Sequence, residues 1–310
     1  MEAAAAAAQE LLAHEAPFTH WARYVELRIG RASRVVAVEQ DPDSFVLGAT
    51  VWDSSKTLFQ FIERHPERFE GLMSICELGA GCGGLAGIAS AIVTHGLADV
   101  VLTDVGPVLP WLRRNVRANL TDRERQRVRV EQCVWGTPVT RLKAPFDCLL
   151  CADVVYEKAC VKPLVQSLLA LSHRKTVIFV ANERRAPAVR AEFMRYLDTY
   201  FQWQEVPAGA LEVDGRKETI EVFELRRKKR RVPREMRIGT ASEDWDHHKG
   251  LHDDGDGQDT SPSDVWNDLL RDLSSDRAHG SKVGVCDGSS SNDDNSNDDN
   301  SNDGNNNGTC

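Results

Sequence analysis

A glycine-rich segment stands where an apolar run gives way to a helical pattern. Gly79, Gly81 and Gly84 match the spacing G-x-G-x-x-G and follow the apolar run Ser74–Leu78. Glycines there allow a tight turn and a close approach of the backbone to a ligand, and the next helix offers free N–H donors. Asp104 ends another apolar run about 25 residues further on, where a carboxylate can bind ribose hydroxyls. The two signals fit a site for a nicotinamide dinucleotide or for S-adenosylmethionine, and a glycine-rich turn without a ligand is the alternative.

Glu77, just before the glycines, favours the second ligand. A dinucleotide site has apolar residues at this point and leaves room for pyrophosphate, whereas a carboxylate suits a ligand that has a cationic end and no phosphate. Asp153 and Tyr156 stand at the end of the apolar run Phe146–Val155, and Trp135 ends a further run. Because open parallel sheets bind ligands at the carboxyl ends of their strands, we expect Asp153 and Tyr156 near the sulfonium and Trp135 beside the adenine. The alternatives are a turn-capping Asp with Tyr packed beneath it, and a core Trp.

The elements that position these residues alternate apolar runs with amphipathic helices. The predicted strands are Ser74–Leu78, Asp99–Asp104, Arg127–Trp135, Phe146–Val155, Lys175–Ala181, Phe201–Val206 and Thr219–Leu225. The predicted helices between them are Gly84–Gly96, Val108–Leu120, Val161–Leu171 and Ala188–Tyr200. Continuous apolar strands separated by helices indicate a parallel sheet covered on both faces, and the last two strands are too close in sequence for a crossover helix. The fold class expected is α/β, a mostly parallel seven-stranded Rossmann-like sheet with a C-terminal antiparallel hairpin, which is the layout of class I methyltransferases.

Charge is divided unevenly along the 310 residues. Residues 240–310 carry 17 acidic and 4 basic side chains, so the net charge of −9 belongs to this tail and the rest of the chain is mildly basic. We divide the chain into an N-terminal extension (1–44), a methyltransferase domain (45–231) and a disordered acidic low-complexity tail (232–310). Val265–Leu273 is the one stretch of the tail with helical apolar spacing, either a partner helix or a chance cluster. Before residue 74, Ala32–Val38 is predicted as a strand, and Val46–Arg64 as a strand running into a helix.

Composition also limits which partners and which cellular compartment we expect for the protein. The basic excess is too small to indicate nucleic acid, and no apolar run is long enough to span a membrane. The start of the sequence has no signal-peptide pattern, and several of the eight cysteines lie in predicted buried strands, which favours a cytoplasmic protein without disulfides. The run Arg226–Arg231 is either a nuclear localisation signal or a solvated strand exit. We expect no metal site, since the tail histidines lie in a segment predicted to be disordered.

Six segments together resemble a known family. They are VWDSS at 51–55, ELGAGCGG at 77–84, LTD at 102–104, NVRANL at 115–120, VWG at 134–136 and ADVVY at 152–156. In this order and spacing they resemble the seven-β-strand protein lysine methyltransferases grouped as methyltransferase family 16, most closely the branch that acts on chaperones and related ATPases. The resemblance covers residues 45–225. The sequence departs from the family at Cys82, where Thr or Ser is frequent, and at residues 182–185, which match only loosely.

The resemblance implies a cofactor and a set of site residues. It implies an S-adenosylmethionine site made by Trp52, Gly79, Ala80, Gly81, Asp104, Trp135 and Ala152. The family's D-x-x-Y motif matches Asp153 and Tyr156, which places them near the target amine. Without the resemblance, Trp52 is interpreted as a core residue.

The expected function is methyl transfer from S-adenosylmethionine to a protein side-chain amine, with lysine as the acceptor and a chaperone or ATPase as the partner. The alternatives are a non-catalytic S-adenosylmethionine-binding scaffold, or an enzyme acting on arginine, histidine or a small amine. No Asn/Asp-Pro-Pro-Tyr strand end is present, which argues against planar amines such as adenine or glutamine amides. We expect a monomer.

Overall fold

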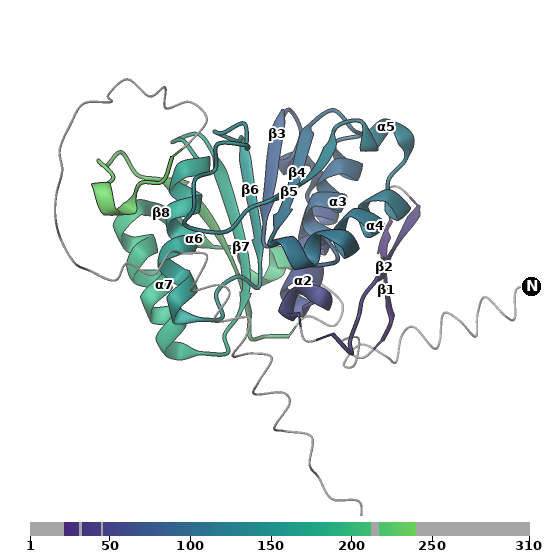
Figure 1. Ribbon diagram of the computed structural model, residues 1–310, viewed down its shortest axis with the longest axis horizontal. Coiled ribbons are helices and arrows are strands. Elements are labelled where there is room, and N and C mark those ends of the chain that lie inside the picture. Colours follow the sequence, from purple (N-terminus) through teal and green to yellow (C-terminus); the bar gives the residue numbers. More distant parts are fainter. Residues whose placement is uncertain (1–21, 31–32, 45, 212–216, 240–310) are drawn as a thin grey trace, which may run out of the picture.

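The computed structural model describes residues 22–30, 33–44, 46–211 and 217–239 (Figure 1). The acidic tail from residue 240, with its stretch Val265–Leu273, lies outside the described residues, as do residues 1–21 of the N-terminal extension. Within the described part, no helix is long and apolar enough to cross a membrane.

A seven-stranded sheet in the order β5-β4-β3-β6-β7-β9-β8 forms the centre of the fold (Figure 1). Its strands are β3 (Ser74–Leu78), β4 (Asp99–Asp104), β5 (Val128–Gln132), β6 (Cys148–Ala152), β7 (Val177–Glu183), β8 (Phe201–Glu205) and β9 (Ile220–Arg227). The strands β5, β4, β3, β6 and β7 are parallel, and β9 lies antiparallel between β7 and β8. The predicted fold class is therefore confirmed, including the antiparallel hairpin at the C-terminal end of the sheet.

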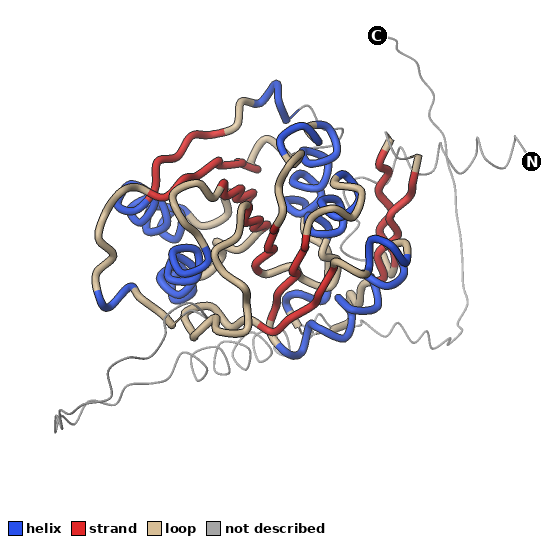
Figure 2. The backbone as a smooth tube through the Cα atoms, turned by 90° about the horizontal axis from the view of Figure 1, so that it is seen from above, coloured by secondary structure: helices blue, strands red, loops and turns tan. Residues whose placement is uncertain are grey.

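Helices cover both faces of this sheet, as Figures 1 and 2 show. One apolar core lies beneath α2 (Asp53–Arg64), α3 (Leu85–Val93) and α4 (Leu109–Asn119), and the second lies beneath α6 (Lys158–Leu171) and α7 (Pro187–Tyr200). A short helix, α5 (Asp122–Arg125), leads into β5. Cys148 belongs to the first core and Cys151 to the second, because successive side chains of a strand point to opposite faces.

The segment before the sheet differs from the predicted one. An antiparallel hairpin of β1 (Tyr24–Ile29) and β2 (Arg34–Glu39) forms a separate two-stranded sheet. β1 was not predicted, although its sequence alternates polar and apolar residues with period two. The predicted strand from Val46 is wrong: a 3₁₀ helix at Leu47–Ala49 leads into α2.

At the other end, ordered structure continues past residue 231, where the predicted tail begins. Val232 and Met236 are buried against the second core, and the N–H of Val139 donates to the carbonyl of Gly239 at 2.9 Å.

Two asparagines of α4 hold the hairpin against the main domain. The side-chain amide of Asn119 accepts from the N–H of Ala37 and donates to its carbonyl, both at 2.8 Å. Asn115 makes the same pair of bonds with Glu39, at 2.9 and 2.8 Å, and also donates to the carbonyl of Cys82 at 2.8 Å. Spaced four residues apart on one helix face, the two amides serve the free edge of β2 as a neighbouring strand would.

Replacement Asn119→Ala should destabilise the fold, because it leaves the part-buried N–H and carbonyl of Ala37 without their partner. We expect a loss of about 1–3 kcal/mol in the free energy of unfolding, since an unsatisfied buried group costs about 1–3 kcal/mol and these two groups are partly exposed to water. Denaturant titration measures the loss. Arg113→Ala, at an exposed position of the same helix, is the control and should cost under about 0.5 kcal/mol. Equal effects of the two substitutions would contradict the role of Asn119.

Candidate active site

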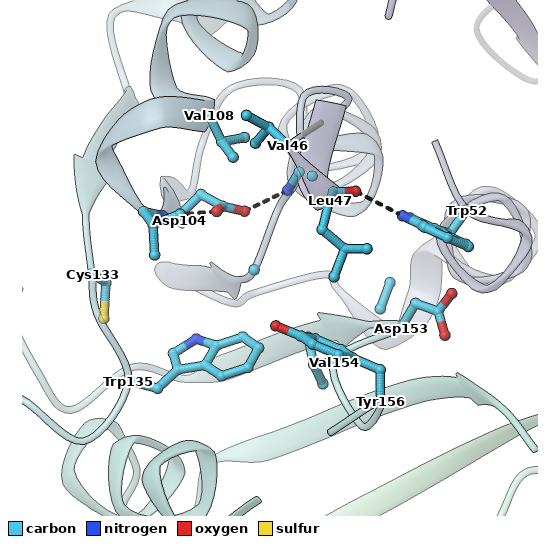
Figure 3. A pocket seen from close by; sticks show the side chains of 15 residues that line it. Val46, Leu47, Trp52, Asp104, Val108, Cys133, Trp135, Asp153, Val154 and Tyr156 are labelled. Carbon is cyan, nitrogen blue, oxygen red and sulfur yellow. Dashed lines mark hydrogen bonds between the residues drawn. The ribbon is translucent and has the colours of Figure 1, made fainter. Parts of the chain in front are cut away.

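A cavity opens where β3, β4 and β6 end, with about 740 Å³ of space including its open mouth (Figure 3). Of the residues predicted from the sequence, it is lined by Trp52, Gly79, Gly81, Asp104, Trp135, Ala152, Asp153 and Tyr156. The sequence did not single out the other lining residues, which are Val46, Leu47, Gly48, Val105, Val108, Cys133 and Val154. No lysine or arginine is among the lining residues, whereas two carboxylates are. This balance suits a cationic ligand better than a phosphate-bearing one.

The glycine loop after β3 forms one wall of the cavity. Gly79 and Gly81 have φ of 68° and 61°, in the left-handed region that residues other than glycine rarely adopt. A Cβ on Gly79 would lie 2.8 Å from Cζ2 of Trp135 and 3.0 Å from Cγ1 of Val154, so only glycine leaves the indole in place. The N–H of Cys82 donates to the carbonyl of Gly48 at 2.7 Å, which ties the loop to the turn that precedes α2.

Asp104 ends β4 directly opposite this loop. Its Oδ2 accepts from the N–H of Gly81 at 2.8 Å and its Oδ1 from the N–H of Val105 at 2.7 Å. Burial raises the pKa of Asp104 to about 6, although both backbone N–H groups lower it. At neutral pH the carboxylate is therefore largely ionised, and an ionised carboxylate has about four acceptor positions, of which two are used here. The remaining two are available to ribose hydroxyls.

Aromatic side chains supply further walls. Figure 3 shows Trp135 and Tyr156 on one side of the cavity, with Asp104 and Val108 on the other. The Nε1 of Trp52 donates to the carbonyl of Leu47 at 3.3 Å, so Trp52 is fixed at the rim between the Leu47 turn and α2. Trp52 thus lies on the cavity rather than in the core.

Glu77 and Ala80, also predicted as cofactor contacts, do not line the cavity. Glu77 is 1% exposed, and its Oε2 accepts from the N–H of Gly87 in the first turn of α3, at 2.8 Å. Burial raises the pKa of Glu77 to about 8. Because it lies one residue short of the end of β3, its side chain points into the start of α3 instead of toward the strand edge. Ala80 is buried in the loop, where its N–H donates to the carbonyl of Thr103 at 3.0 Å.

Asp153 lies at the end of the cavity near Trp52 (Figure 3). Its backbone has φ of 58°, an unusual conformation for a residue other than glycine that costs about 1–3 kcal/mol. Oδ2 pairs with Nη2 of Arg185 at 2.6 Å, while Oδ1 is buried and has no hydrogen-bond partner among the described residues. Burial raises the pKa of Asp153, against the lowering effect of Arg185.

Residues 182–185, which match the family only loosely in sequence, hold the D-x-x-Y segment in place. The side chain of Asn182 accepts from the N–H of Val155 at 2.9 Å and donates to its carbonyl at 3.2 Å. Arg185 pairs with Asp153 and with Glu183 and lies 4.6 Å over the ring of Trp52. The order of the sheet could have indicated this role, since β7 lies parallel beside β6 and the two strands end at the same edge.

The residues present fit S-adenosylmethionine. The N–H-bound carboxylate of Asp104 suits ribose hydroxyls, the Gly79–Gly81 turn admits a ligand close to the backbone, and Trp135 offers an aromatic face. The unpaired Oδ1 of Asp153 is an acceptor at the far end of the same cavity. Among the residues that the structure describes, no three His, Cys, Asp or Glu side chains gather as metal ligands would.

Replacement Gly79→Ala should lower the affinity for S-adenosylmethionine at least about tenfold, because a methyl group there displaces the Trp135 ring. Calorimetric titration of the cofactor measures the change. Gly71→Ala is the matched control, since Gly71 has φ of 75° but nothing within 4 Å of an added Cβ. That control should lose only about 1 kcal/mol of stability and bind the cofactor normally. Normal binding by Gly79→Ala would show that the close approach to Trp135 is dispensable.

Replacement Glu77→Gln should change how stability depends on pH. The folded-state pKa of Glu77, about 8, exceeds its ordinary value of 4.5, so the folded protein holds a proton that the unfolded chain releases. The stability of the wild type therefore falls as pH rises from about 4.5 to 8. The variant has no such proton, and we expect it to gain on the wild type by up to a few kcal/mol between pH 5 and pH 9. Denaturant unfolding at both pH values measures this difference, with Glu70→Gln at an exposed position as the control. Parallel pH profiles of stability for the wild type and Glu77→Gln would contradict the raised pKa.

Solved structures that this chain matches include the glycopeptide N-methyltransferase MtfA in complex with S-adenosylmethionine. It has a TM-score of 0.41 and 13% sequence identity, over 55% of this chain and 93% of that one.

Curated relatives are more similar in sequence. The protein N-lysine methyltransferase METTL21A of Xenopus tropicalis is 31% identical over 150 residues, covering 48% of this chain and 67% of that protein. METTL21A of Danio rerio is 31% identical over 176 residues, with 56% and 78% covered. The EEF1A lysine methyltransferase 3 of Xenopus tropicalis is 28% identical over 184 residues, with 58% and 75% covered.

Residues 31–200 match the family model described as lysine methyltransferase, which is more than half of the chain. The match begins before residue 45, so β2 and the turn after it are part of the family domain. The chain thus belongs to the lysine methyltransferase family, and it is an S-adenosylmethionine-dependent enzyme that methylates lysine in proteins.

Proposed function

We propose that the substrate is a chaperone or a related ATPase, and that its lysine enters the cavity beside Asp153. The observation that carries the placement of the lysine is Asp153, which lines the cavity at the end of β6 and whose buried Oδ1 has no hydrogen-bond partner among the described residues. A buried acceptor without a donor is costly, so a partner that supplies an N–H group there is strongly favoured. The choice of substrate rests on the six segments that resemble the branch acting on chaperones and ATPases.

Asp153 and Tyr156 have different roles in this proposal. When bound, S-adenosylmethionine supplies an electrophilic methyl group. A free lysine has a pKa near 10.4, and partial burial in the cavity lowers that value. Asp153 orients the amine through Oδ1, and its own raised pKa makes it a better proton acceptor than an exposed aspartate. Burial raises the pKa of Tyr156, so its hydroxyl stays protonated and shapes the pocket without acting as a base.

Arg185 is the counter-charge of Asp153 in this proposal. Its guanidinium holds Oδ2 and leaves Oδ1 for the substrate, while Glu183 and the ring of Trp52 keep the guanidinium at the rim. Glu183 is in turn 3.8 Å from Nζ of Lys217, which pairs with Asp53 at 2.6 Å. This series of ion pairs extends from Asp153 to the start of α2 and holds the end of the cavity that carries Asp153 in place.

A second candidate substrate is the elongation factor named in one relative, the EEF1A lysine methyltransferase 3, which is 28% identical to this chain. The two candidates share the lysine chemistry and differ only in the protein that presents it.

Transfer of labelled methyl groups to purified chaperone ATPases, to the elongation factor and to a whole-cell extract tests the proposal. We expect label on a chaperone or ATPase, and a loss of at least about tenfold with Asp153→Asn. Cofactor affinity of that variant should change less than about threefold, because Asp104 and the glycine loop are intact. Glu205→Gln, at an exposed position of β8, is the control. Label on the elongation factor alone would favour the second candidate. Cofactor binding without labelled protein would contradict the proposed function.

Replacement Arg185→Ala should move the pH profile of methylation. Removing the guanidinium raises the pKa of Asp153, because the charge that now lowers it is lost. If ionised Asp153 is needed, the acidic limb of kcat/KM shifts to higher pH by about one unit or more. Arg184→Ala is the control, since Arg184 contacts Glu221 at 3.8 Å and not Asp153. An acidic limb that does not shift would show that ionised Asp153 is not needed for the proton transfer.

A further inference from the structure

A groove with basic walls lies at the amino ends of the parallel strands, whereas the cavity lies at their carboxyl ends. Since β9 runs antiparallel to β7, with Leu225 opposite Ile178, the end of β9 lies at the amino end of β7. Two adjoining hollows there have about 980 and 850 Å³ of space including their open mouths. We call them together the basic groove, whose basic residues are His173, Arg174, Arg227–Arg231 and Arg237. The segment after β9 is green in Figure 1, and Gln166 of α6 donates to the carbonyl of Glu235 in this segment at 2.8 Å.

No carboxylate balances these charges within the described part of the chain. Neither hollow is lined by Asp or Glu, and none of Arg227–Arg231 has an ion-pair partner among the described residues. Arg227 donates instead to the carbonyls of Leu169 and Ser172, at 3.0 and 2.9 Å, and burial lowers its pKa. A cluster of positive charges around a hollow attracts an anionic ligand or segment.

Apolar residues are also among the lining of the basic groove, and we call them its floor. Leu169, Ala170, Val232, Met236 and Ile238 line the larger hollow. A fitting occupant therefore combines carboxylates with apolar side chains, which distinguishes it from a nucleic acid or a free phosphate.

The chain itself contains such a segment. Ile238 lines the groove, and the described chain ends at Gly239, so residues 240–310 begin at its edge with 17 acidic and 4 basic side chains. Within them, residues 264–273 have the sequence DVWNDLLRDL, which joins three aspartates to five apolar residues at helical spacing. The 24 residues between 239 and 264 are enough for the segment to return to the groove, since a linker of that length spans roughly 25–30 Å on the random-coil relation. A tether of this length gives an effective concentration of about millimolar.

We propose that residues 264–273 dock in the basic groove of the same chain. Asp264, Asp268 and Asp272 pair with the basic walls, and Trp266 and Leu270 cover the apolar floor. This contact is independent of the proposed substrate, because the groove and the cavity lie at opposite edges of the sheet. A bound tail segment occupies the groove against other acidic proteins and leaves the cofactor cavity open.

Zero-length carbodiimide cross-linking of the full chain, followed by mass spectrometry, tests the docking. An equal mixture of ¹⁴N- and ¹⁵N-labelled protein separates links within one chain from links between two. We expect links from Lys228 or Lys229 to Asp264, Asp268 or Asp272, within single chains and weakened by salt. The triple variant Asp264→Asn, Asp268→Asn, Asp272→Asn should lose the remaining tail links at least about fivefold. A control variant that replaces Asp293, Asp294, Asp298 and Asp299 by Asn should keep the links to Asp264, Asp268 and Asp272.

The apolar half of the contact has its own test. Trp266→Ala should lower the yield of these links at least about threefold, whereas Trp245→Ala should leave it unchanged. Links spread over all tail aspartates in proportion to their number would overturn the proposal, and so would links found only between two chains. A changed cofactor affinity in the triple variant would place the tail at the cavity and overturn the location.

Discussion

The hydrogen bond from the N–H of Gly81 to Asp104 joins the two strand ends on which the rest of the site depends. It requires β3 and β4 to lie side by side and in parallel, so that the loop after one strand meets the last residue of the other. The loop that makes this bond has a left-handed backbone at Gly79 and Gly81. Glycine is needed at position 79 for a second reason, because a side chain there would push Trp135 out of the cavity wall. Glu77 secures the same loop from behind by binding the first turn of α3.

A second pair of strand ends, those of β6 and β7, forms the acceptor side of the cavity. Asp153 is buried in a strained backbone conformation, and that conformation persists because two neighbours hold its segment: Asn182 binds both backbone groups of Val155, and Arg185 binds the carboxylate. Burial and the guanidinium act on the pKa of Asp153 in opposite directions. Oδ2 is thereby paired with Arg185, while Oδ1 is left unpaired. An incoming amine needs such an unpaired acceptor.

The sheet separates two electrostatic environments. The cavity at the carboxyl ends of its parallel strands is lined by Asp104 and Asp153 and by no lysine or arginine, although Arg185 pairs with Asp153 at the rim. The basic groove at the amino ends of the strands has no carboxylate among its lining residues. Because β9 runs against its neighbours, its basic C-terminal residues lie away from the cofactor. Catalysis and contact with an acidic segment can therefore take place on one small domain without interfering.

Local patterns were enough to predict most strands and some of the residues that line the cavity. Ser74–Leu78 and Asp99–Asp104 have the predicted bounds, since continuous apolar runs followed by Gly or Asp mark buried parallel strands. The position of Asp104, Asp153, Gly79 and Trp135 at one edge followed from the parallel order alone. Only the tertiary structure decided which way a side chain points and what it pairs with. Glu77 turned to the helix because it precedes the strand end, and Asn182 and Arg185 gained their roles because β7 lies next to β6. The pairings of Asn182 and Arg185 join residues 27 and 32 positions apart, and no local pattern encodes them.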